Sequence, residues 1–289
     1  MLKLSLSLSL TQEQELLVKI FVVVLLLSSL FLLGTVGVVE SQCTTNPVIF
    51  NFGDSNSDTG GLSAGTGSIF GPPNGRTFFH SSTGGRLSDG RLVIDLLCKK
   101  VSWTNEGLKN AVYTFDIGQN DLSGAFSSNL PYDQVIQRIP SFIAEIKSAL
   151  WSVFQNGGRN FWIHNTGPLG CLPQRLSLAS HSPGDLDQHG CLQHLLMLRK
   201  PLMNNCMLMH KLRSAMENVT IVYTDIFAIK YDLIANSAVY GFENPLTACC
   251  GFGGPPYNVN NTVGCGQTGY NVCAQGTHAI HQLGWNSLH

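Results

Sequence analysis

The sequence predicts a three-layer α/β fold with a mainly parallel central sheet. Short β-rich runs alternate with helical patterns, an order typical of βαβ units, whose strands are parallel. The apolar content of 44% in 289 residues is enough for a buried core, and a charged content of 12% argues against disorder. Predicted strands cover 48–52, 111–117, 161–165 and 220–225, and predicted helices cover 132–155, 186–216 and 226–236.

The first predicted strand ends in a turn that carries a serine. Val48 to Phe52 is apolar except for Asn51, and the next residues are Gly53, Asp54 and Ser55. Because α/β sheets place their sites at strand ends, this turn is a good place to expose a nucleophile. The alternative is an Asx-turn or a helix N-cap, in which Asp54 or Ser55 only binds backbone N–H groups.

A second strand also ends in polar residues, at Gly118, Gln119 and Asn120. An asparagine amide and a backbone N–H can stabilise an oxyanion if they point to the same place as the nucleophile. The alternative is an ordinary glycine-asparagine turn. His164 lies within the third predicted strand, and we expect it to be packed in the core.

The pattern between the strands gives further predictions. Apolar residues at three-to-four spacing predict the helix at 132–155, which Pro140 would weaken or kink. The stretch 60–85 is rich in glycine, serine and proline and predicts a loop, either a connection or a lid over the site. Ser88 is the expected N-cap of a helix that ends at Leu97.

The N-terminal 41 residues are expected to be a secretory signal peptide. Ile20 to Val39 is uncharged and almost wholly apolar, and we expect cleavage close to Gln42, leaving a single domain at 42–289. The alternative is a signal anchor, because 20 apolar residues can span a bilayer of about 30 Å.

The net charge of −1 argues against nucleic acid or an anionic membrane as a partner. A stable membrane partner is expected only if the N-terminal segment stays uncleaved. His278 and His281 form an H-x-x-H pair that could bind metal on a helix, but no carboxylate lies near it. We therefore predict no metal site.

Nine cysteines lie between Cys43 and Cys273, and disulfides are the natural interpretation in an exported chain. Two pairings are plausible by proximity, Cys171 with Cys191 and Cys250 with Cys265. Spacing alone leaves the connectivity open, and the odd count leaves at least one thiol over. Asn218 and Asn260 begin N-glycosylation sequons, which matter only if the chain is exported.

Three stretches resemble signature blocks of the plant GDSL esterase/lipases, a branch of the SGNH hydrolases. Phe52 to Gly60 resembles the first block, Phe115 to Asp121 the third, and Phe161 to Cys171 the fourth. The resemblance implies an SGNH-hydrolase-like fold and a secreted serine esterase or lipase, extracellular or in the cell wall. It implies Ser55 as nucleophile, with the Ser55 N–H and Asn120 as oxyanion donors. The implied substrate is a small-molecule ester, either a lipid or an acylated cell-wall compound, and no cofactor is needed.

The chain departs from this family in two places. The family takes its base and orienting acid from one D-x-x-H turn near the C-terminus, and no aspartate here has a histidine three residues later. The second block is also missing, in the short polar stretch near 98–110. The base is therefore unknown, with a substitute at His278 or His281 as one hypothesis. Two further alternatives are a glycoside-active or acyl-transferring enzyme of the cell wall, and an inactive secreted relic or mis-spliced product.

Overall fold

The structure is a computed structural model that describes residues 48–76, 85–88, 90–97, 107–128, 130–199, 211–260 and 262–273. The expected signal peptide, the stretch 98–106 and the tail with His278 and His281 lie outside the described residues. Within the described part of the chain, no helix combines the length and apolar character needed to cross a membrane.

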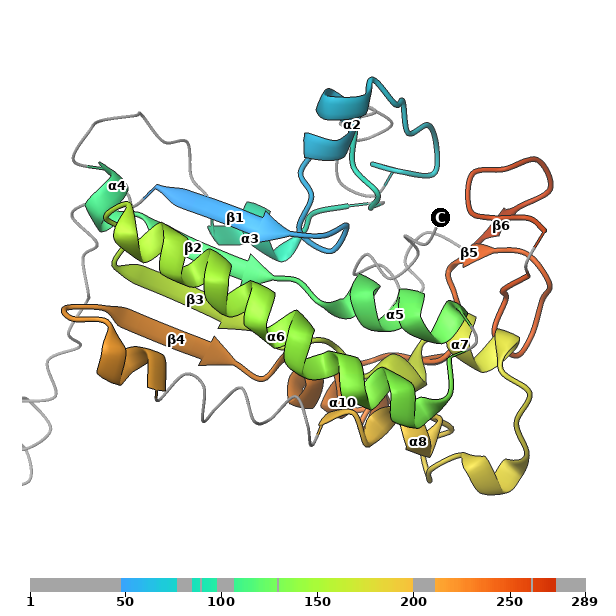
Figure 1. The fold of residues 1–289 in the computed structure, drawn as a ribbon. Coiled ribbons are helices and arrows are strands. Elements are labelled where there is room, and N and C mark those ends of the chain that lie inside the picture. The colour runs from blue at the N-terminus through green and yellow to red at the C-terminus, as the bar shows by residue number, and fades with distance from the viewer. Residues whose placement is uncertain are drawn as a thin grey trace, which may run out of the picture. The chain divides into compact units, whose positions relative to one another are not determined.

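Four parallel strands form the central sheet, as the sequence predicts. Their order in space is also their order in the chain, and each pairs in parallel register with the next. The right-hand ends of the strands in Figure 1 are their carboxyl ends, where the turns after β1 and β2 lie. The strands are β1 (Ile49–Gly53), β2 (Val112–Asp116), β3 (Asn160–His164) and β4 (Thr220–Thr224).

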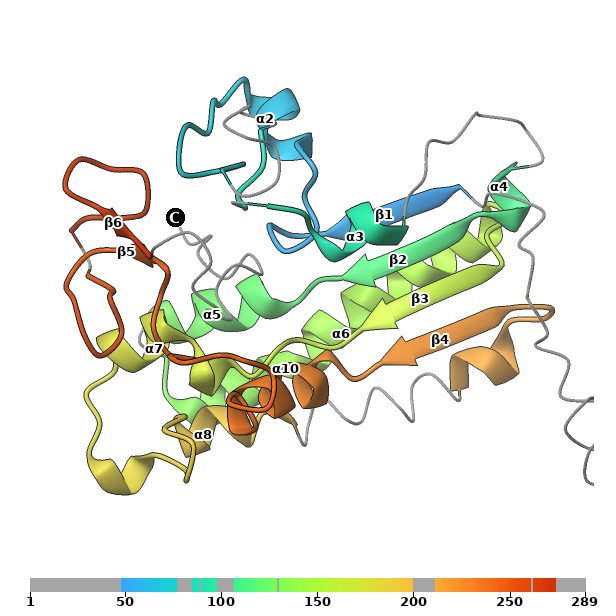
Figure 2. The same cartoon turned by 180° about the vertical axis from the view of Figure 1, so that it is seen from behind.

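Helices lie on both sides of the sheet, a long one packed against one face and a short one near the edge of the other. The face with Tyr113 and Phe161 packs against α6 (Tyr132–Gln155) in one buried cluster, and Figure 1 shows α6 lying across this face. The opposite face carries Thr114 and Trp162. Figure 2 shows α3 (Val93–Leu97) on that side, near β1.

A second core lies beyond the carboxyl ends of the strands. Leu122, Ile139, Leu176 and Ile234 are each at most 3% exposed and belong to one cluster. The Cys171–Cys191 disulfide lies within the same cluster. The elements that contribute to it or connect them are α5 (Gln119–Ser127), η1 (Leu169–Cys171), α7 (Pro173–Leu178), η2 (Pro183–Asp185), α8 (Gln193–Leu196) and α10 (Ile226–Ala235).

The remaining elements are small. A two-stranded antiparallel ribbon of β5 (Cys250–Gly251) and β6 (Asn271–Val272) lies near the carboxyl end of the sheet, and α4 (Gly107–Asn110) precedes β2. The predicted loop at 60–85 was wrong in part, because α2 (Gly61–Thr66) forms there. Its first backbone N–H groups are bound by the Asp58 carboxylate, at 2.9 Å from Gly60 and 2.5 Å from Gly61.

Other boundaries also differ from the prediction. The helix predicted at 186–216 does not run through 186–192, where Leu186 forms a β-bridge with Leu192 and Gly190 has a φ of 82°. Ser88 is not the N-cap of α3: the Leu92 N–H donates instead to Asp95, at 2.8 Å. Pro140 lies inside α6 without ending it.

Candidate active site

The serine-bearing turn after β1 is held by its own aspartate. The Asp54 carboxylate accepts hydrogen bonds from the Asn56 backbone N–H (2.9 Å) and side-chain amide (2.8 Å), which is the geometry of an Asx-turn. A Cβ at Gly53 would lie 1.9 Å from the Ser57 hydroxyl oxygen and 3.2 Å from the Asp116 carbonyl oxygen, so a side chain there would displace the Ser57 hydroxyl. Asp54 therefore forms the Asx-turn that was one of the two interpretations of this stretch. Ser55, the next residue, lines a cleft.

Asn120 reaches the same cleft from the second turn. Gly118, with a φ of 110°, turns the chain out of β2, and α5 begins at the next residue. The two turns are joined directly, because the Asp54 N–H donates to the Asp116 carbonyl at 3.3 Å. Ser55 and Asn120 both line a cleft of about 990 Å³. The sequence indicated a turn at Asn120 but missed the helix that fixes its position.

A hydrogen-bond chain braces the underside of the serine turn. Thr114 donates to the side-chain oxygen of Asn51 at 2.6 Å, and the Asn51 amide donates to the Ser57 carbonyl at 3.1 Å. The one polar residue of the first strand therefore links β2 to the turn. Its position in an otherwise apolar strand was the sequence signal for this role.

A smaller cavity of about 100 Å³ lies against the polar face of the sheet, lined by Ser57, Asp116, His164 and Lys230 among others. His164 is part-buried and lines this cavity rather than packing in the core as expected, and its Nδ1 is 4.0 Å from an Asp116 carboxylate oxygen. Burial raises the pKa of Asp54, and the nearby Asp116 charge raises it further. Burial lowers the pKa of Lys230, against the opposing effect of both carboxylates.

One side of the cleft, which we call the core-backed wall, is built from α5 and α7. Ser123 and Ser127 lie on the cleft side of α5, and Gln174 of α7 lines the cleft beside them. Behind them the buried Arg175 guanidinium donates to the Ser123 carbonyl (2.5 Å), the Ser123 hydroxyl and the Ser127 hydroxyl (3.1 Å). The second core packs behind these two helices.

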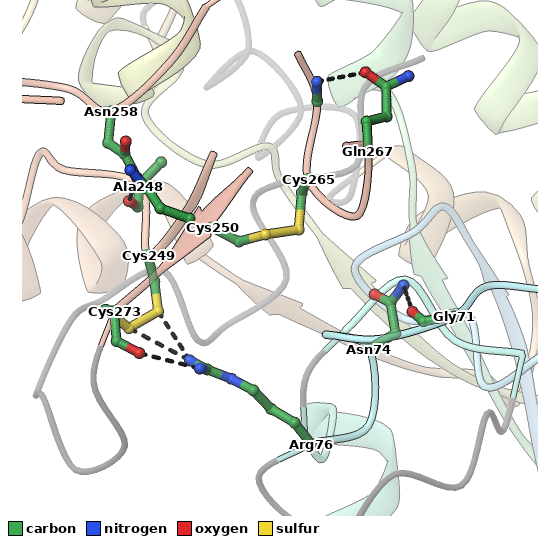
Figure 3. Close-up of a disulfide and its surroundings, with 12 residues drawn as sticks. Gly71, Asn74, Arg76, Ala248, Cys249, Cys250, Asn258, Cys265, Gln267 and Cys273 are labelled. Carbon is green, nitrogen blue, oxygen red and sulfur yellow. Dashed lines mark hydrogen bonds between the residues drawn. A yellow bond between two sulfur atoms is a disulfide. The ribbon is translucent and has the colours of Figure 1, made fainter. Parts of the chain in front are cut away.

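The facing side, which we call the loop wall, comprises residues 58–76 with α2. It contributes Leu62 to the cleft, but α2 buries none of its residues. Arg76 extends from this wall to the Cys249–Cys273 disulfide, as Figure 3 shows. Its guanidinium donates to the Cys273 carbonyl (3.0 Å) and to the sulfurs of Cys249 (3.2 Å) and Cys273 (3.4 Å).

Three disulfides lie within the described residues, and two of them, Cys249–Cys273 and Cys250–Cys265, are in the segment 248–273. The Cys171–Cys191 and Cys250–Cys265 pairs that proximity suggested are both present. Nothing in the sequence pattern indicated the third pair, Cys249–Cys273, or the contact of Arg76 with it. Among the described residues no group of histidine, cysteine, aspartate or glutamate side chains could hold a metal ion.

A serine and an amide side chain that line one cleft at the strand ends of a parallel sheet are the starting point of an α/β serine hydrolase site. The family model for the GDSL-like lipase/acylhydrolases matches residues 100–289 of this chain. The chain belongs to this family, which includes plant proteins that are named esterase/lipases.

Three relatives illustrate the range of similarity. GDSL esterase/lipase LIP-4 of Arabidopsis thaliana is 42% identical, over 86% of this chain and 83% of its own length. GDSL esterase/lipase ACHE of Zea mays is 33% identical, over 76% of this chain and 74% of its own. Alpha-L-fucosidase 3 of Arabidopsis thaliana is 32% identical, over 83% of this chain and 85% of its own.

The LIP-4 alignment also shows that this chain lacks residues that its relative has. It runs over 319 positions, but 86% of 289 residues is about 249, so about 70 aligned positions have no residue in this chain. These positions are internal to the alignment.

Proposed function

We propose that this protein is a secreted esterase or lipase that hydrolyses carboxylic esters through an acyl-enzyme on Ser55. The observation that carries the proposal is that Ser55 and Asn120, which lie 65 positions apart in the sequence, line one cleft. Family membership supports ester hydrolysis, and the disulfides support an oxidising, extracellular location such as the cell wall. N-glycosylation at Asn218 and Asn260 belongs to the same proposal.

The proposed reaction has two steps. The Ser55 hydroxyl oxygen attacks the acyl carbonyl, the bond to the alcohol breaks, and the alcohol leaves with a proton. Water then attacks the acyl-serine and releases the carboxylic acid and free Ser55. The Ser55 N–H and the Asn120 amide stabilise the oxyanion of each tetrahedral intermediate, and a single such donor contributes about 10²–10³-fold to kcat.

The general base of this mechanism is not identified. A serine nucleophile needs a base within hydrogen-bond reach, and none of the described histidines lines the cleft. His278 and His281, the hypothetical substitutes, lie outside the described residues. We infer that the missing internal segment lies near 98–110, which would remove the second signature block and its oxyanion donor.

A second candidate function follows from the same observation. A cleft with a serine but no histidine among its described lining residues suits an inactive secreted relic or a mis-spliced product. A glycoside-active or acyl-transferring enzyme of the cell wall is a third candidate, supported only by the 32% identity to a protein named as a fucosidase.

Hydrolysis of p-nitrophenyl butyrate by the purified full chain separates the first two candidates. Wild-type protein, Ser55→Ala and a matched control, Ser141→Ala on the exposed surface of α6, are assayed together. For an esterase, Ser55→Ala falls to the background rate while Ser141→Ala keeps the wild-type rate, and Asn120→Ala loses about 10²-fold or more in kcat. Equal rates in wild type and Ser55→Ala would show that the chain is inactive.

A further inference from the structure

Two of the disulfides differ in how far solvent can reach them. Cys171 and Cys191 are both 0% exposed, and their disulfide lies within the apolar second core. In the Cys249–Cys273 disulfide only Cys249 is buried, at 5% exposure, whereas Cys273 is partly exposed. A thiol in solution can therefore approach the second disulfide from the side of Cys273, but the first is covered by protein.

The same accessible disulfide has a cation against it. One nitrogen of the Arg76 guanidinium, Nη2, lies 3.2 Å from the Cys249 sulfur and 3.4 Å from the Cys273 sulfur. The other terminal nitrogen, Nη1, donates to the Cys273 carbonyl at 3.0 Å, which fixes the guanidinium in this position. Figure 3 shows the Arg76 side chain extended toward both sulfurs.

A positive charge at a disulfide favours one reaction of that bond. When an external thiolate attacks one sulfur, the other sulfur leaves as a thiolate, and it leaves faster when that thiolate is stabilised. A neighbouring arginine stabilises the anionic thiolate, whereas the neutral disulfide gains much less from the same charge. Arg76 should therefore stabilise the reduced state of Cys249–Cys273 more than the oxidised state.

We propose that Cys249–Cys273 is a site of thiol–disulfide exchange with low-molecular-weight thiols. The thiolate sulfur of the small molecule bonds to the Cys273 sulfur, the Cys249–Cys273 bond breaks, and its electron pair stays on Cys249 as a thiolate beside Arg76. A second small thiolate then attacks the mixed disulfide and releases Cys273. Two small thiols are oxidised to one disulfide, and their two protons go to the two cysteines.

The backbone keeps the opened pair together, so the exchange is reversible. The Cys273 N–H donates to the Cys249 carbonyl at 2.7 Å, and the residues that follow and precede these two form the β5–β6 ribbon. The Cys250–Cys265 disulfide closes the same segment independently. Because Arg76 belongs to the loop wall, the site of exchange is attached to one wall of the cleft, but the proposal requires no activity of Ser55.

The experiment measures each disulfide separately in the purified full chain. The protein is equilibrated with graded ratios of reduced to oxidised glutathione at about pH 8, where small thiols are partly ionised. Free thiols are trapped by alkylation, and peptide mass spectrometry gives the reduced fraction of each pair. Cys249–Cys273 should be reduced at ratios that leave Cys171–Cys191 oxidised, and early samples should carry glutathione on Cys273. Reduction of Cys171–Cys191 first, or glutathione on Cys249 alone, would overturn the proposal.

Variants of Arg76 distinguish the charge from a structural contact, because the two predict opposite signs. If Arg76 only holds the segment in place, Arg76→Gln loosens it and makes Cys249–Cys273 easier to reduce. The proposal instead predicts that Arg76→Gln lowers the equilibrium constant for reduction at least about tenfold, equivalent to about 30 mV. Arg76→Lys should keep most of the wild-type value, and Cys171–Cys191 should change in neither variant. An unchanged or larger constant in Arg76→Gln would reject the proposal.

Discussion

The core-backed wall and the loop wall of the cleft border the same space but differ in what lies behind them. Leu122 of α5 is 1% exposed and packs in the second core, whereas α2 buries no residue and Leu62 is 47% exposed. The loop wall is held by polar contacts instead. The Asp58 carboxylate binds the N–H groups at the start of α2, and Arg76 contacts the Cys249–Cys273 disulfide. Small units that cannot bury enough apolar surface commonly depend on such cross-links.

This difference has a consequence for the site. The nucleophile turn precedes the loop wall directly, while Asn120 belongs to the core-backed wall. The two halves of the proposed oxyanion hole therefore depend on different stabilising interactions. The oxyanion donor of α5 should therefore persist under conditions that loosen the loop wall.

The largest expected difference is between two leucines, one on each wall. Leu122→Ala removes a fully buried side chain and should lower the free energy of unfolding by about 2–5 kcal/mol. Leu62→Ala changes a half-exposed side chain and should cost no more than about 0.5 kcal/mol. Urea denaturation followed by tryptophan fluorescence measures both. Similar costs for the two variants would show that the loop wall has a core of its own.

The second prediction concerns the Cys249–Cys273 disulfide behind the loop wall. Replacing both cysteines by alanine opens a loop closed over 24 positions, a change of about 2–4 kcal/mol in local stability. We expect hydrogen exchange to become faster in 248–273 and in 71–76, where Arg76 contacts the cysteines, and to stay unchanged in α5.

Arg76→Gln is the matched control, because it keeps the disulfide but loses the charged donor at the Cys273 carbonyl and both sulfurs. It should increase exchange in 71–76 alone. Faster exchange in α5 in either variant would contradict the independence of the two walls.

The sequence predicted the strands and turns of this site better than the long-range contacts that hold them in place. The strand at 48–52, its turn and the parallel sheet follow from local patterns, and the family resemblance selected Ser55 and Asn120 from several polar turns. The contact of Arg76 with Cys273 joins residues 197 positions apart, and no local pattern encodes it. The helix predicted across 186–192 was wrong, because the Cys171–Cys191 disulfide and a left-handed Gly190 hold that stretch in another conformation.

The smallest expected effect lies in the turn between the two walls. Burial raises the pKa of Asp54 above its ordinary value of 3.8, so the folded protein holds this proton at a pH where the unfolded chain has released it. The stability contribution of Asp54 is therefore greatest below pH 3.8 and falls as the pH rises through the folded pKa. The hydrogen bonds from Asn56 and the charge of Lys230 lower the pKa of Asp54 and oppose the effect of burial, whereas the charge of Asp116 adds to it.

Asp54→Asn removes this titration while its side-chain oxygen can still accept from the Asn56 backbone N–H. The midpoint of thermal unfolding is measured for both proteins at several values between pH 3 and pH 7. The wild type should lose stability relative to the variant as the pH rises from 3.8, with the difference levelling off above the folded pKa. A constant difference across this range would mean that Asp54 titrates alike in both states, and that the turn is as open to water as the loop wall beside it.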